Sequence, residues 1–140
     1  MIPAASPMIL FQSACVVASF VDAEQHLIIQ AKPADIDETS VDQLFKITEA
    51  LMQEKDAFQT TWDLIECRNP SIKITSKCIR WAMSHRKLLN SKNSRLAVVS
   101  KSRPINAVVS LVLKTFGPSC PTLVTSEKSE AVNFMHASSS

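Results

Sequence analysis

Short apolar runs alternate with longer amphipathic stretches along this chain. Runs rich in β-branched and aromatic residues are typical of strands, and apolar residues at intervals of three and four are typical of helices. The runs that predict strands are residues 15–21, 26–31, 58–67, 96–99 and 122–125. The stretches that predict helices are residues 40–55, 75–89, 103–116 and 127–136.

Capping signals place the ends of these helices. Ser40 stands three residues before a glutamine, which is the spacing of a capping box. Residues 103–116 contain many β-branched residues, but Pro104 lies in the expected first turn and Gly117-Pro118 follows the last. Proline favours the start of a helix and glycine its end. We therefore expect a helix there rather than a strand.

The resulting order is β-β-α-β-α-β-α-β-α. This order predicts an α/β fold in which one mostly parallel sheet, with an N-terminal antiparallel hairpin, carries helices packed on it. We expect a single domain over residues 15–137 and leave residues 1–14 as an N-terminal segment without an assigned element. No Lys or Arg precedes the first apolar run, and prolines interrupt its start. These features predict no signal peptide and no membrane span, and favour a cytoplasmic protein.

Charge changes this picture, because the net charge of +2 hides a division. Residues 1–66 carry eleven acidic and three basic residues, whereas residues 67–126 carry eleven basic residues and no acidic one. The division predicts an electropositive surface on the second half. It also suggests that the chain forms a homodimer in which the acidic side of one copy contacts the basic side of another.

Several chemistries lack the residues that they need. The four cysteines and three histidines are scattered, so no zinc-type grouping is present, and free thiols are expected. The single glycine excludes glycine-rich phosphate loops and the Gly-x-Ser-x-Gly nucleophile motif. We therefore expect no metal, no organic cofactor, no catalytic residue and no enzymatic activity. Nucleic-acid binding is disfavoured, because aromatic residues are few and tyrosine is absent.

Four stretches carry a resemblance to a known fold family. They are Trp62-Asp63-Leu64 at a strand end, residues 80–89 with a Trp-x-x-x-His-Arg core, residues 96–100, and residues 118–124 followed by residues 127–134. They resemble the STAS/SpoIIAA-like fold, and within it the bacterial STAS/SEC14-like group. The resemblance implies a non-catalytic regulatory domain and, more distantly, a lipid-binding pocket.

Thr75 and Ser76 are candidates for phosphorylation. In the anti-anti-sigma members of that family, a phosphorylatable serine lies at the start of the matching helix, inside Asp-Ser-Ser-Gly. Here the matching residues keep the hydroxyls but lack the Asp and the Gly. A phosphate at a helix N-terminus would be stabilised by free N–H groups and the helix dipole. The alternative is that Thr75 or Ser76 is a plain N-cap.

A group of basic residues forms the second candidate site. It lies on the predicted helix 75–89 and on the loops that follow two strands, where ligands of open α/β sheets bind. We expect it to contact another protein or a small anionic ligand, and the alternative is a solvated basic surface. Its members are Arg68, Lys73, Lys77, Arg80, Lys87, Lys101 and Arg103.

Two ring side chains on the same helix leave alternatives open. Trp81 is either an exposed anchor for a partner or part of the edge of the core. His85 is interpreted as structural, although a Cys67/His85/Glu66 arrangement can be drawn.

The sequence thus favours a non-catalytic regulatory or protein–protein interaction module that uses the basic helix and the adjacent loops. The alternative is a binder of a small anionic or lipid ligand at the carboxyl ends of the strands.

Overall fold

The computed structural model describes residues 7–68 and 70–136 of the chain. Its strands are β1 (Met8–Gln12), β2 (Val16–Val21), β3 (His26–Ala31), β4 (Phe58–Asp63), β5 (Asn93–Val99) and β6 (Thr122–Thr125). Its helices are η1 (Asp22–Glu24, a 3-10 helix), α1 (Glu38–Glu54), α2 (Ile72–Ser84), α3 (Arg86–Lys92), α4 (Arg103–Phe116) and α5 (Lys128–His136).

Within the described residues, the strands form one sheet in the order β1-β2-β3-β4-β5-β6. The first three strands pair antiparallel, and β3 to β6 pair parallel. The predicted α/β class is confirmed, as is the mostly parallel sheet with its antiparallel N-terminal part. Strands adjacent in sequence are adjacent in the sheet, and the connections between the parallel strands β3 to β6 each contain at least one helix.

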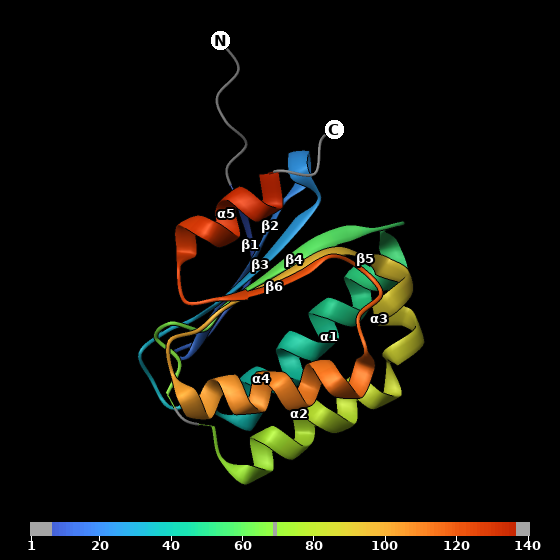
Figure 1. Ribbon diagram of the computed structural model, residues 1–140. Helices are drawn as coiled ribbons and strands as arrows, with labels where there is room; N and C mark the ends of the chain where they lie inside the picture. The colour runs from blue at the N-terminus through green and yellow to red at the C-terminus, as the bar shows by residue number, and fades with distance from the viewer. Residues whose placement is uncertain (1–6, 69, 137–140) are drawn as a thin grey trace.

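The helices divide unequally between the two faces of the sheet. Figure 1 shows α1, α2, α3 and α4 below the sheet and α5 above it. We call these the helix-rich face and the α5 face. Side chains alternate along each strand, so neighbouring residues serve different faces. On β5, Val98 faces α1, α2 and α4, whereas Ala97 and Val99 pack against Ala131 and Met135 of α5.

The start and the length of α2 differ from the prediction. Ser71, rather than Thr75 or Ser76, is the N-cap, and its hydroxyl accepts a hydrogen bond from the Ile74 amide at 3.1 Å. Several hydroxyl residues precede the apolar stretch, and the earlier start lets Ile74 reach the core, where it is 4% exposed. The predicted single helix is broken at His85, with α3 beginning at the next residue.

Other boundaries move by a few residues for local reasons. The expected helix cap at Ser40 is wrong: α1 begins earlier, because Asp37 is the N-cap and accepts from the Ser40 amide at 2.7 Å. The strand predicted to reach residue 67 ends at Asp63, whose carboxylate accepts from the Ile65 amide at 3.3 Å as the chain turns. Residues 8–12, which the sequence left without an element, form the edge strand β1.

Across residues 7–68 and 70–136, none of the helices combines the length and the apolar character that crossing a bilayer requires.

Candidate functional site

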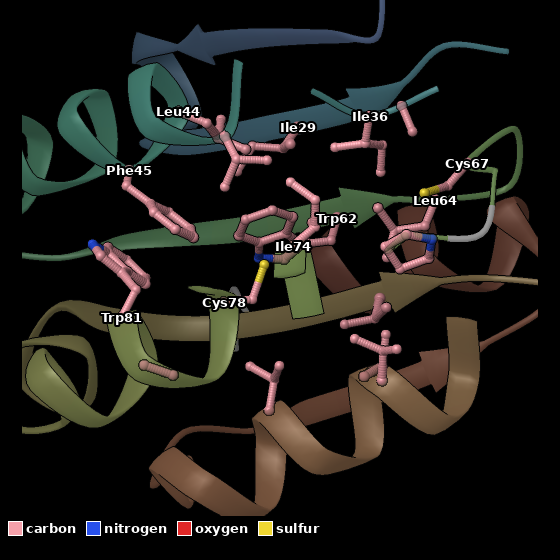
Figure 2. Close-up of a pocket in the computed structure, with 18 of the residues that line it drawn as sticks. Ile29, Ile36, Leu44, Phe45, Trp62, Leu64, Cys67, Ile74, Cys78 and Trp81 are labelled. Atoms are coloured by element: carbon pink, nitrogen blue, oxygen red, sulfur yellow. The ribbon is translucent and has the colours of Figure 1, made fainter. Parts of the chain in front are cut away.

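An apolar cavity of about 210 Å³ lies between the helix-rich face of the sheet and helices α1, α2 and α4. Figure 2 shows side chains from both layers pointing into this space. The sheet contributes Ile29, Trp62 and Val98, one from each of three adjacent strands. The helices contribute side chains such as Phe45 and Ile74. Alternate residues of the strands and the inner sides of the helices therefore line one shared space.

Most of the polar side chains at this cavity hydrogen-bond within the protein. The Ser40 hydroxyl donates to Asp37 at 3.0 Å, and the Thr48 hydroxyl donates to the Leu44 carbonyl at 2.9 Å. The Thr60 hydroxyl donates to the Asn93 side chain at 2.8 Å. Buried water needs two to four polar partners. The cavity therefore offers little to water and suits an apolar guest.

Aromatic stacking closes one end of the cavity. Trp81 of α2 lies parallel to Phe45 of α1, with ring centroids 4.5 Å apart and an interplanar angle of 5°. On its other side Trp81 stacks with His85 at 4.7 Å. Figure 2 places Phe45 and Trp81 at one end of the view, opposite Ile36 and Cys67. The structure therefore packs Trp81 into the wall of the cavity, in agreement with the alternative that it belongs to the edge of the core.

The opposite end of the cavity is built by loops at the carboxyl edge of the sheet. Ile36 comes from the loop after β3, and Leu64, Cys67 and Pro70 come from the segment after β4. These four residues are partly exposed. The cavity therefore approaches solvent at the edge where the sequence predicted ligand binding.

The size of the cavity limits what it can hold. An engineered apolar cavity of about 150 Å³ stays dry and binds benzene or xenon. Pockets for drug-sized ligands measure about 300–1,000 Å³. The space of about 210 Å³ falls between these values. It suits a short acyl chain or a small ring, but not a whole phospholipid.

Three of the predicted basic residues pair with acidic residues near the start of α1. Lys77 lies 2.6 Å from Asp42, and Lys73 lies 3.0 Å from Glu38. The hydrogen bond from Lys73 holds the pKa of Glu38 below its usual value, and the hydrogen bond to Asp42 raises the pKa of Lys77.

Arg68 also meets an acidic partner from the first half of the chain, at 3.7 Å from Asp35. The acidic and basic halves of the sequence therefore meet within the molecule, along the seam between α1 and α2. These internal pairs use part of the charge complementarity that homodimerisation would need, and the homodimer stays a prediction.

The remaining members of the basic group are differently placed. Among the described residues, Arg80, Lys87, Lys101 and Arg103 are exposed and form no ion pair. Arg80 lies on α2 and Lys87 on α3, whereas Lys101 and Arg103 lie before and at the start of α4. The group thus divides into three residues that pair with carboxylates (Arg68, Lys73 and Lys77) and four that are unpaired among the described residues.

The expected position of Thr75 and Ser76 at the helix N-terminus is wrong. Ser71 takes that position, and the Thr75 amide already donates to the Ser71 carbonyl at 3.0 Å. A phosphate on either residue would therefore not meet the free N–H groups of the first turn. Thr75 instead lines the cavity, and Ser76 is exposed. Phosphorylation of either residue stays an untested prediction.

His85 has a partner that the sequence analysis missed. Its Nε2 atom contacts the Glu49 carboxylate of α1, and its Nδ1 atom lies 2.9 Å from the Trp81 carbonyl oxygen. Both ring nitrogens are thus engaged within the fold, which supports a structural role. No local pattern in the sequence indicates Glu49 as this partner, because the pair depends on how α1 lies against α2.

The arrangement of Cys67, His85 and Glu66 finds no support in these contacts. Burial raises the pKa of the Cys67 thiol to about 11, and its Sγ donates to the Arg68 carbonyl at 3.3 Å. A protonated thiol is a poor nucleophile. Cys15, Cys67 and Cys78 all line the cavity, and each is a free cysteine.

Residues 7–68 and 70–136 contain no group of three His, Cys, Asp or Glu side chains placed to hold an ion.

Comparison of the chain with protein-family models, curated proteins and solved structures finds no significant match. The resemblance to the STAS/SpoIIAA-like fold therefore stays a prediction, and the cavity is the feature from which function is argued.

Proposed function

We propose that this domain binds a small apolar or amphiphilic molecule in the cavity between the sheet and helices α1, α2 and α4. The observation that carries the proposal is an apolar space of about 210 Å³ whose nearby hydroxyl groups are mostly hydrogen-bonded within the protein. Of the two functions expected from the sequence, the ligand binder thus receives the more direct support.

The energetic cost of this space favours occupation. Residual cavities cost about 24 cal/mol per Å³ in core-truncation series, so an empty space of about 210 Å³ costs on the order of 5 kcal/mol. A guest that fills it recovers part of this energy, and each buried methylene contributes about 0.8 kcal/mol. Affinity is therefore expected to rise about four-fold per methylene until the cavity is full.

The polar end of an amphiphile would lie at the loop end of the cavity. Ile36, Leu64 and Cys67 border that end, and Arg68 follows Cys67 with its side chain 59% exposed. Its ion pair with the largely exposed Asp35 spans 3.7 Å, and such surface pairs contribute little energy. Arg68 can therefore exchange this partner for a ligand carboxylate or phosphate.

Tryptophan fluorescence tests ligand binding directly. The chain has two tryptophans, so Trp81→Phe leaves Trp62 in the cavity wall as the sole fluorophore. Titration with butyrate, hexanoate, octanoate and decanoate should shift Trp62 emission, with tighter binding for longer chains. Native mass spectrometry of gently purified protein should also show any ligand that co-purifies.

A matched pair of substitutions locates the site. Val109 of α4 lines the cavity, whereas Val132 of α5 is 46% exposed. In the Trp81→Phe background, Val109→Phe should weaken decanoate binding at least ten-fold, and Val132→Phe should leave it unchanged. Absence of any emission shift, or equal affinities for the two variants, would contradict the proposal.

The regulatory protein-interaction module stays a second prediction. Its support is the exposed surface of α2, on which Arg80, unpaired among the described residues, lies beside exposed apolar side chains. The same surface also suits a partner other than an acidic protein, and binding experiments can distinguish the two.

A further inference from the structure

Helix α2 exposes large apolar side chains on the side that faces away from the sheet. Ile72 is 87% exposed and Met83 is 62% exposed. With Ser76 and Ile79 between them, these residues follow helical spacing along one side of the helix. We call Ile72, Ser76, Ile79, Arg80 and Met83 the α2 outer face.

Basic side chains border this apolar stripe. Lys73, Ser76, Ile79 and Arg80 together line a shallow surface hollow. Arg80 has no ion-pair partner among the described residues. No acidic residue occurs between residues 67 and 126, which include all of α2, α3 and α4. Arg80 is thus not balanced by a carboxylate on its own helix, whereas Lys73 pairs with Glu38 of α1 at 3.0 Å.

We propose that the α2 outer face docks on the surface of an anionic lipid bilayer. Surface-bound helices combine apolar side chains, which enter the region between headgroups and acyl chains, with Lys and Arg that meet anionic headgroups. Each Lys or Arg near an anionic leaflet strengthens binding about five-fold. Charge complementarity and the two exposed apolar side chains both match this occupant.

The inner side of the same helix favours a bilayer over an acidic protein. Ile74, Cys78 and Ala82 of α2 line the cavity, so this helix separates the proposed ligand from the proposed surface. In this respect the inference rests on the proposed function, since an amphiphilic ligand partitions into membranes.

Vesicle co-sedimentation of the full chain tests the proposal. The protein should sediment with vesicles that mix phosphatidylcholine and phosphatidylglycerol, and much less with phosphatidylcholine alone. Raising the salt concentration should weaken binding, because the attraction between exposed charges is screened. Equal binding to both vesicle types, or binding to neither, would overturn the proposal.

Matched variants separate the surface from net charge. Arg80→Glu and Lys46→Glu change the net charge equally, but Lys46 is an exposed residue of α1. Arg80→Glu should weaken vesicle binding at least about five-fold, and Lys46→Glu much less. Replacing both Ile72 and Met83 by serine should also weaken it, whereas Val132→Ser on α5 should not. Equal effects within either pair would overturn the proposal.

Further arms identify the partner class and keep the two proposals distinct. Beads coated with polyglutamate test an acidic protein as the partner. If Arg80→Glu weakens binding to these beads, the double serine variant leaves it intact and the protein binds no vesicles, the partner is an acidic protein and docking on lipid is overturned. Val109→Phe should lose decanoate and keep vesicle binding. Decanoate binding without vesicle binding overturns docking alone, and vesicle binding without decanoate binding overturns the proposed function alone.

Discussion

The two faces of the sheet are packed in different ways. On the α5 face, Ala97 and Val99 meet Ala131 and Met135, and each of these side chains is at most 2% exposed. On the helix-rich face, large side chains such as Trp62 and Phe45 surround a space of about 210 Å³. Small residues let a helix approach a sheet closely, whereas aromatic residues stacked on one another hold the helices around a gap.

We place the proposed function in the less closely packed layer. A close-packed layer stabilises the fold but has no room for a guest. The helix-rich face instead combines the cavity, the loop end near Arg68 and the α2 outer face with Arg80, which is unpaired within the described part of the chain. Adjacent residues of β5 serve the two faces, so they allow the comparison to be tested with identical substitutions.

Truncation of adjacent valines should give the largest effect. Val99→Ala on the α5 face should lower the free energy of unfolding by roughly 2–3 kcal/mol, because it removes well-packed methyl groups. Val98→Ala should cost about 1 kcal/mol less, since Val98 already borders empty space and loses fewer contacts. Urea unfolding of both variants measures the difference. Equal costs would show that the two faces are packed alike.

Enlargement of the same valines should give effects of opposite sign. Val99→Ile adds a methylene to a full layer and should cost roughly 1–3 kcal/mol. Val98→Ile places that methylene in the cavity and should stabilise the protein by about 0.8 kcal/mol. The midpoint of thermal unfolding should therefore fall for Val99→Ile and rise for Val98→Ile. A fall of similar size in both would remove the distinction between the faces.

Protonation of the buried His26 should give a smaller effect, which is a dependence of the free energy of unfolding on pH. This side chain is 7% exposed, and its Nε2 atom lies 2.7 Å from the Thr61 hydroxyl. Burial lowers the pKa of His26 from 6.5, although Glu24 acts in the opposite direction. The unfolded state then binds more protons, so stability should fall as pH decreases through 6.5 toward the pKa of the folded state.

Replacement of the imidazole tests this assignment. His26→Gln keeps a polar side chain but cannot titrate, and it should flatten the dependence of the unfolding free energy on pH. The matched control is His136→Gln, because His136 is exposed and lies 3.1 Å from the same Glu24. If the pH dependence survives His26→Gln but disappears with His136→Gln, its source is His136 and not His26, which would contradict this prediction.

The sequence predicted the layers of the fold from local signals. Helix α4 spans Arg103–Phe116 as expected, because Pro104 and Gly117 mark its ends despite many β-branched residues between them. Strand β1 was missed, because its run of apolar residues shows no alternation and only pairing with β2 establishes it. The start of α2 was misplaced because several hydroxyl residues there can act as caps.

The site could be predicted only in part. Hydrophobic periodicity identifies the side chains that face inward, such as those of Phe45 and Trp62, but it does not show whether their volumes fill the space between layers. The pairs between Lys77 and Asp42 and between His85 and Glu49 depend on how α1 lies against α2. Neither the cavity nor these contacts has a local signature in the sequence.

Xenon binding is the most direct test of the difference between the faces. Xenon occupies dry apolar cavities without needing any polar contact. A crystal of the protein under xenon pressure should show xenon between Trp62, Ile74 and Val109 on the helix-rich face, and none beneath α5. Absence of xenon from the helix-rich face, or its presence beneath α5, would contradict the account.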